Sequence, residues 1–306
     1  MRKYVLKRLI AAVLTMWVLI TVVFFLVRLM PGDPFQNPKM TTEIRKNMEE
    51  YYGFDKPLIV QYGNYMKNLF KGDLGYSMKF TNKTVNGIIT ESFPFSADLG
   101  IRALVFAVSF GLVLGIISAR NRGGKLDFFC VIVAVLGTSI PDFIMGALLQ
   151  YGFGIKWGLL PVAQYQGFEY TILPACAIGF YTLASVSRFM RASMLEVSSQ
   201  DYIKTARSKG VSEFRITVKH QIRNAIMPVM TMMGPTVASV LTGTFVIESI
   251  FAIPGMGKYY VESVSNNDYS MVLGMTIFYG VFLILCNLIV DILYGVADPR
   301  VRIGEK

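Results

Sequence analysis

Six long apolar runs, separated by polar segments, most constrain what this chain can fold into. A helix needs about 20 mainly apolar residues to cross the hydrocarbon core of a bilayer. The runs cover residues 9–27, 103–119, 128–152, 170–187, 225–246 and 271–290. They predict an all-α integral membrane protein with six transmembrane helices. Because the second run is short, we expect its helix to begin a few residues earlier, near Ser96.

The composition agrees with a chain solvated by lipid. Hydrophobic residues make up 53% of the sequence and charged residues 16%, against about 25% charged residues in soluble domains. The net charge of +10 could indicate nucleic-acid binding, but the basic residues lie in short segments between the apolar runs. That distribution is typical of membrane topology, so we expect membrane lipid and no nucleic acid as a partner.

The first apolar run could be a cleaved signal peptide, because basic residues precede it. Its apolar stretch is longer than the roughly 7–15 residues usual in such signals. It is followed by Arg28-Leu-Met-Pro-Gly-Asp-Pro34 in place of a small-x-small cleavage site. We therefore expect a retained helix.

Lysine and arginine near the helix ends predict the orientation, since they are enriched in cytoplasmic loops. They concentrate at the amino end, at 120–125, at 188–223 and in the tail at 300–306. These are alternate segments in a chain with six crossings. The pattern predicts that both ends are cytoplasmic.

This topology predicts three parts. Residues 1–30 form the cytoplasmic amino end and first transmembrane helix, residues 31–95 an extracellular helical cap, and residues 96–306 a five-helix core with a cytoplasmic loop at 188–224. In the cap, Thr41 and Thr42 precede Glu43 as a helix start, and two apolar stripes have helical spacing. The cap is either a packing element or a docking surface for an external partner. The stripes are Leu58, Tyr62, Tyr65, Met66, Leu69 and Val85, Ile88, Ile89, Phe93.

The cytoplasmic loop contains a short amphipathic pattern at 199–210. Tyr202, Ile203 and Ala206 can share one face, because residues three and four apart are neighbours on a helix. Gly210 is suited to close this helix in a left-handed conformation. The alternative is an ordinary basic loop that only fixes the topology.

The same loop carries a resemblance to a known family. The segments DYIKTARSKG at 201–210 and HQIRNAIMP at 220–228 resemble the coupling loop of ABC importer permeases of the dipeptide/oligopeptide/nickel family, in the form found in B-type oligopeptide permease subunits. Further matching segments lie at 28–34, 52–57, 72–75, 248–257, 268–269, 287–291 and 298–300, so the resemblance covers nearly the whole chain. One departure is that the general Glu-Ala-Ala motif is replaced by Lys204-Thr205-Ala206.

The resemblance implies a type I ABC importer permease in the plasma membrane that forms half of the pathway for oligopeptide uptake. It implies a second homologous permease, two cytoplasmic ATPase subunits and an extracellular peptide-binding protein as partners. The sequence has no GxxxxGK[ST] segment, so we expect no enzymatic activity and no cofactor bound by this chain, with ATP-Mg held by the partner ATPases. Dipeptides or nickel are alternative cargoes.

The resemblance places the ATPase contact at Asp201, Tyr202, Ala206, Lys209 and Gly210. In the membrane, Asp142 follows Pro141, which can kink the third span. A charge there is costly, so Asp142 either faces the translocation pathway or stabilises the kink. Since it is the only acid away from the helix ends, an ion-coupled secondary transporter is a weaker alternative.

Other motifs favour packing over chemistry. Gly111 and Gly115 form a GxxxG segment that allows close helix approach. The three cysteines, Cys130, Cys176 and Cys286, lie in apolar runs without metal-like spacing. No HExxH or GxSxG segment indicates a membrane enzyme, and His220, the only histidine, lies in the cytoplasmic loop. No metal site is expected.

Overall fold

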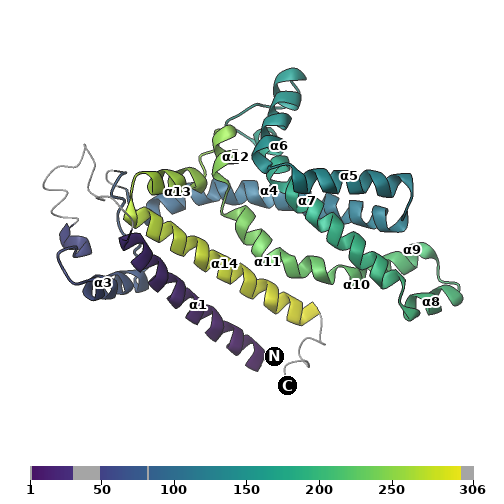
Figure 1. Cartoon of the computed structure of the whole chain (residues 1–306), viewed down its shortest axis with the longest axis horizontal. Helices are drawn as coiled ribbons and strands as arrows, with labels where there is room; N and C mark the ends of the chain where they lie inside the picture. Colours follow the sequence, from purple (N-terminus) through teal and green to yellow (C-terminus); the bar gives the residue numbers. More distant parts are fainter. Residues whose placement is uncertain (1, 30–48, 81–82, 298–306) are drawn as a thin grey trace. The chain divides into compact units, whose positions relative to one another are not determined.

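The computed structural model describes residues 2–29, 49–80 and 83–297. Within this part the chain is helical, and its only β contact is an isolated bridge between Tyr76 and Thr84 (Figure 1). The principal helices are α1 (Arg2–Arg28), α3 (Leu58–Phe70), α4 (Val85–Arg120), α5 (Lys125–Ser139), α6 (Asp142–Leu149), α7 (Phe168–Ser198), α8 (Asp201–Ser208), α11 (Met227–Leu241), α12 (Phe245–Ile250), α13 (Met256–Ser265) and α14 (Tyr269–Ala297). Short segments complete them: η1 (Gln150–Lys156) and η2 (Ile216–Ile222), both π-helical, α9 (Glu213–Arg215) and α10 (Arg223–Ala225).

The described helices provide the expected membrane spans. Five are long and apolar enough to cross a bilayer, and the pair Lys125–Ser139 and Asp142–Lys156 makes a sixth if it is counted as one bent span. The pair is bent by 111° at the break. The break falls at Ile140 and Pro141, as the proline predicted, because proline lacks the N–H that an unbroken helix needs.

Helices α4 and α7 extend furthest beyond the apolar runs that indicated them. Helix α4 begins at Val85, well before Ser96, and passes through Pro94 without ending. The stripe of Val85, Ile88 and Ile89 therefore belongs to the first turns of this span. Burial of these side chains against α13 and α14 stabilises the helix there. Helix α7 continues past residue 187 to Ser198, about three further turns.

The helices form two compact units. The first contains Met1–Ser96 and Pro254–Leu285, and the second contains Ala97–Ile253 and Cys286–Lys306. Helices α4 and α14 contribute residues to both. The predicted division at residues 30 and 95 stays a prediction.

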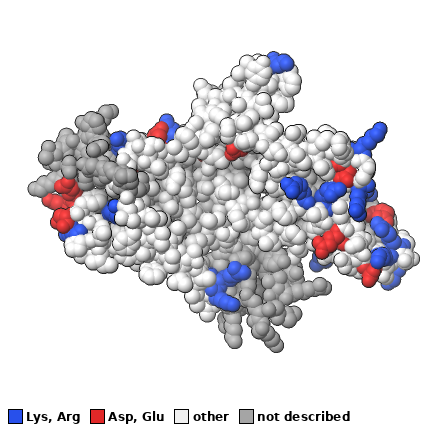
Figure 2. Space-filling model, in the orientation of Figure 1, with Lys and Arg blue, Asp and Glu red and all other residues white. Residues whose placement is uncertain are grey.

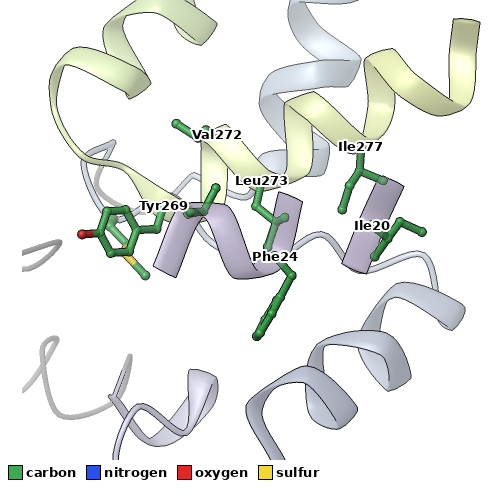
Figure 3. Packing of buried hydrophobic residues seen from close by; sticks show 8 residues of the cluster. Ile20, Phe24, Tyr269, Val272, Leu273 and Ile277 are labelled. Atoms are coloured by element: carbon green, nitrogen blue, oxygen red, sulfur yellow. The ribbon is translucent and has the colours of Figure 1, made fainter. Parts of the chain in front are cut away.

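The first unit is built around the contact of α1 with the amino-terminal half of α14. Phe24 is 1% exposed and lies among Ile20, Leu273 and Ile277 (Figure 3). Helix α3 packs its predicted stripe against this cluster through Tyr62, Tyr65, Met66 and Leu69. The expected helix start at Thr41, Thr42 and Glu43 lies outside the described residues.

Small residues set the packing of the second unit. A Cβ atom added to Gly111 would lie 2.8 Å from the carbonyl oxygen of Leu183, and one added to Gly115 would lie 2.7 Å from that of Ser187. Gly137 of α5 approaches α7 equally closely, with an added Cβ 2.6 Å from Cβ of Ala184. The prediction that the GxxxG segment serves packing is confirmed, since glycine alone allows these backbones to approach.

Much apolar surface remains exposed on the spans. On α1, Leu14 and Trp17 are more than half exposed, and on α4 Val105 and Phe110 are as well. A soluble protein rarely exposes such continuous apolar surface, whereas lipid solvates it at no cost.

Candidate coupling loop and transport pathway

Helix α8 is a short, well-anchored element between α7 and the helices that lead into α11. Ile203 is fully buried, and Tyr202 is exposed with its hydroxyl 3.0 Å from Nδ2 of Asn224, which donates to it. The amide of Gln221 donates to Oγ of Ser198 at 2.9 Å. Tyr202 and Ile203 therefore do not share one face of the helix as predicted, because Ile203 is buried against the rest of the chain while Tyr202 is exposed. The bond between Tyr202 and Asn224 ties α8 to α10, and the bond between Gln221 and Ser198 ties η2 to the end of α7. Because α8 is bonded to α10 and directly follows α7, displacement of α8 is transmitted to both.

Gly210 ends this helix as predicted. Its φ is +74°, a conformation that residues with a Cβ atom adopt only at a cost. The N–H of Gly210 donates to the carbonyl of Arg207 at 2.9 Å, and the N–H of Val211 donates to that of Ala206 at 3.2 Å. Carbonyls that the last turn leaves unpaired are thereby satisfied.

Two ion pairs fix the surface of the loop. Nε and Nη2 of Arg207 lie 2.6 and 3.1 Å from the two carboxylate oxygens of Glu213, and Nζ of Lys204 lies 2.9 Å from Oδ1 of Asp201. The hydrogen bond from Arg207 lowers the pKa of Glu213, and that from Lys204 lowers the pKa of Asp201. Because both pairs are solvated, they orient side chains more than they stabilise the fold.

Four of the five residues predicted to meet the ATPase are exposed and the fifth, Ala206, is half-buried. The exposed residues are Asp201, Tyr202, Lys209 and Gly210. Charged side chains of both signs gather over α8 and α9 in Figure 2. The structure brings these residues to one small surface, and their contact with a partner stays a prediction.

Pro141 and Asp142 lie where α5 ends and α6 begins. The carboxylate of Asp142 accepts the N–H of Phe143 at 2.8 Å and is half-buried. An acid in the first turn of a helix is favourable, since it meets unpaired N–H groups there. A role for either residue in the translocation pathway stays a prediction.

The sequence reasoning missed an ion pair and a cavity. Arg191 of α7 binds Asp127 of α5 through two hydrogen bonds, whereas the sequence indicates only that Arg191 belongs to the basic segment at 188–223. Beside this pair lies a cavity of about 960 Å³ between α5 and α7. The sequence feature that could have indicated this cavity is the repeat of polar residues along α7, at 181, 185 and 188.

In the described residues no group of three or more histidine, cysteine or acidic side chains is arranged to hold a metal ion. The three cysteines are free thiols, with Cys130 buried.

Comparison with known proteins identifies the family. Residues 111–303 match the family described as "Binding-protein-dependent transport system inner membrane component", and residues 1–100 match its amino-terminal model. The chain belongs to this family. It is therefore a multi-pass permease component of an ABC importer, and the family resemblance inferred from the coupling loop is confirmed.

Individual relatives match over the full length. The chain is 46% identical over 307 residues to the dipeptide transport system permease protein DppB of Bacillus subtilis, covering 100% of both. It is 41% identical over 305 residues to the oligopeptide transport system permease protein OppB of Haemophilus influenzae, covering 99% of this chain and 100% of the relative.

Two solved structures share the fold. One is an inward-facing MetNI methionine ABC transporter, with a TM-score of 0.56 at 13% identity, covering 69% of this chain and 96% of that chain. The other is an amino acid ABC transporter with a TM-score of 0.54 at 14% identity, covering 68% and 92%. They confirm the predicted type I permease fold.

Proposed function

We propose that this permease carries short peptides into the cell, driven by ATP hydrolysis on partner subunits. The observation that supports this most is full-length identity of 39–46% to permeases named for dipeptide and oligopeptide transport. Dipeptides and longer peptides both fall within the proposal, because relatives of each name match over the whole chain.

The proposed assembly contains this chain, a second homologous permease, two cytoplasmic ATPases that bind ATP-Mg, and an external peptide-binding protein. Both ends of the chain would lie in the cytoplasm, which the alternating distribution of lysine and arginine supports. The loop with α8 then lies on the same side as the ATPases.

In the proposed mechanism α8 sits in a cleft of the ATPase. Closure of the ATPase pair on ATP moves α8 as a rigid body. The contact of Tyr202 with Asn224 supports this, since it connects α8 to α10, and the contact of Gln221 with Ser198 connects the flanking segments η2 and α7 to each other. Tilting those helices exposes the pathway alternately to the two sides of the membrane.

The test is purification of the chain with its native partners, followed by reconstitution into vesicles. We expect recovery of a second permease and two ATPases, with ATP-dependent uptake of di- and oligopeptides when the binding protein is added. Nickel uptake without peptide uptake would refute the cargo assignment. Uptake that follows an ion gradient and needs no ATPase would refute the ATP-driven mechanism.

Single-cysteine crosslinking tests the coupling surface. The variant Lys209→Cys should crosslink to an ATPase subunit, and the yield of the crosslinked product should change when ATP is added. A cysteine at Gly158, in a different exposed turn, provides the control and should give no ATPase adduct.

A further inference from the structure

The cavity beside α7 combines enough volume for a small ligand with a specific polar lining. Its volume is about 960 Å³, within the range of 300–1,000 Å³ that is usual for small-ligand sites. Helix α5 contributes Val131, Val135 and Thr138, and α7 contributes residues from Tyr181 to Ala192. All of these belong to the second compact unit.

The polar lining follows one face of α7. Tyr181, Ser185 and Arg188 are spaced by four and three residues, so they lie above one another on the helix. All three line the cavity, and Tyr181 is 58% exposed. Polar and charged side chains within membrane spans usually face a protein interface or a water-filled path. The lining therefore fits a transport pathway better than a lipid-facing surface.

The cavity has one uncompensated positive charge. Of its two arginines, Arg191 is paired with Asp127 at 2.9 Å. Arg188 is exposed and has no hydrogen bond or ion pair within the described part of the chain. No acidic side chain lines this cavity among the described residues. An anionic ligand is therefore the complementary occupant.

The chemistry of Arg188 narrows the ligand class. A guanidinium presents a planar fork that matches a carboxylate through two parallel hydrogen bonds. The carboxyl terminus is the one anionic group that every unmodified linear peptide carries, whatever its side chains. The hydroxyls of Tyr181 and Ser185 can form hydrogen bonds with peptide backbone groups. The apolar residues of α5 do not select for particular side chains of the peptide.

We propose that Arg188 binds the terminal carboxylate of the peptide inside the pathway, with the cavity holding the peptide's last residues. The proposal rests on the proposed function, because it assigns a recognition site for the same cargo. It makes the permease itself selective for a free carboxyl terminus, in addition to any selection by the binding protein.

The first experiment compares one peptide in two forms, with a free and with an amidated carboxyl terminus, in the reconstituted transporter. The variants are Arg188→Gln, which removes the charge, and Arg188→Lys, which keeps it. Arg122→Gln is the matched control, an exposed arginine in the turn between α4 and α5. For each transporter the ratio of the kcat/KM values of the two peptides is measured. Since the same binding protein delivers both peptides throughout, the change in this ratio between the wild type and a variant isolates the contribution of the permease.

Arg188→Gln should lower kcat/KM for the free peptide about tenfold, the low end for a charged hydrogen bond at a partly solvated site, and leave the amidated peptide unchanged. Arg188→Lys should retain most of the preference, and Arg122→Gln should retain all of it. An equal loss for both peptides in Arg188→Gln would overturn the proposal.

The second experiment needs neither delivery by the binding protein nor a correctly assembled variant. The peptide carries a benzophenone on its last residue and is photolysed with the wild-type complex in detergent. The free-carboxyl form should label residues 181–192 about tenfold more than the amidated form. Labelling that is independent of the carboxyl group, or absent from this segment, overturns the proposal.

The same uptake assay distinguishes a peptide site at Arg188 from a lipid site. It is run in phosphatidylcholine vesicles with and without anionic phosphatidylglycerol. If Arg188→Gln affects both peptides equally, and only with the anionic lipid, Arg188 binds lipid headgroups and the proposal is wrong. If the wild type imports neither peptide with ATP, the proposed function fails and the assignment fails with it. Import without any dependence on Arg188 refutes this assignment alone.

Discussion

Arg191 and Asp127, 64 positions apart in the sequence, form a two-point ion pair in which Nε and Nη2 of the arginine each lie 2.9 Å from a carboxylate oxygen. Oδ1 of Asp127 also accepts the hydroxyl of Ser118, and Oδ2 accepts the N–H of Gly123. The carboxylate therefore connects α4, the following turn, α5 and α7. The side chain of Asp127 is 8% exposed and that of Arg191 31%.

Removing this carboxylate should destabilise the protein. Asp127→Ala leaves Arg191 without its partner, and breaking a buried pair costs about 3–5 kcal/mol. Because Arg191 is about one-third exposed, we expect about 2 kcal/mol, seen as a lower midpoint of thermal unfolding in detergent. Glu91→Ala, which breaks the exposed pair with Lys83, should cost under about 1 kcal/mol. Equal effects of the two variants would show that the buried pair contributes no more to stability than the exposed pair.

The spans could be predicted from sequence because lipid imposes a simple requirement of length and low polarity. The same reasoning placed the break at Pro141 and the helix end at Gly210, where single residues have strong backbone preferences. It did not predict that α4 begins at Val85, since that stripe is stabilised by burial against α13 and α14. The helical spacing of this stripe was recognised, but its continuation through Pro94 into the span depends on packing that the local sequence does not show.

The candidate site was predicted less completely for the same reason. The loop residues were found through a resemblance and a helical pattern, both of which are local. The inward direction of Ile203 depends on the helices that cover it. The pairing of Arg191 with Asp127 decides which arginine of the cavity remains uncompensated, and two residues so distant in sequence cannot be matched without the fold.

The close approach of α4 to α7 predicts a large effect from one methyl group. In Gly111→Ala the new Cβ atom would lie 2.8 Å from the carbonyl oxygen of Leu183 and 2.9 Å from Cβ of Val186. Overpacking of this kind costs about 1–3 kcal/mol, so thermal stability and yield should both fall. Gly63→Ala is the matched control, since no atom lies within 4 Å of an added Cβ there. If Gly111→Ala is as stable as Gly63→Ala, the helices are not in contact at this point.

Asp268 predicts a pH-dependent contribution to stability. Its carboxylate precedes α14 and accepts N–H groups from Met78, Lys79 and Met271. Burial is the largest influence and raises its pKa above the ordinary 3.8. The folded state then binds the proton more tightly than the unfolded state. The contribution of Asp268 to stability should therefore be greatest below about pH 4 and decrease as pH rises through its folded pKa.

The measurement for Asp268 is the midpoint of thermal unfolding between pH 4 and pH 7. Asp268→Asn should remove this part of the pH dependence, because the amide does not titrate. It should also lower the midpoint, since the amide nitrogen cannot accept the donors around it. Asp55→Asn changes an exposed acid and should leave the pH dependence as in the wild type. A wild-type slope that persists in Asp268→Asn would assign the titration to another group.

Alanine substitutions at two glycines of similar backbone conformation distinguish an effect on ATPase coupling from an effect on stability. Gly210 and Gly158 have φ values of +74° and +61°, and neither has an atom within 4 Å of an added Cβ. Replacement by alanine at either position should cost about 1–2 kcal/mol in local strain. At Gly210 that strain falls on the end of α8, so it should shift the surface proposed to meet the ATPase. Gly210→Ala should therefore reduce stimulated ATP hydrolysis and peptide uptake several-fold, while Gly158→Ala, with a similar loss of thermal stability, should retain both. Equal transport by the two variants would mean that the geometry of α8 does not limit coupling.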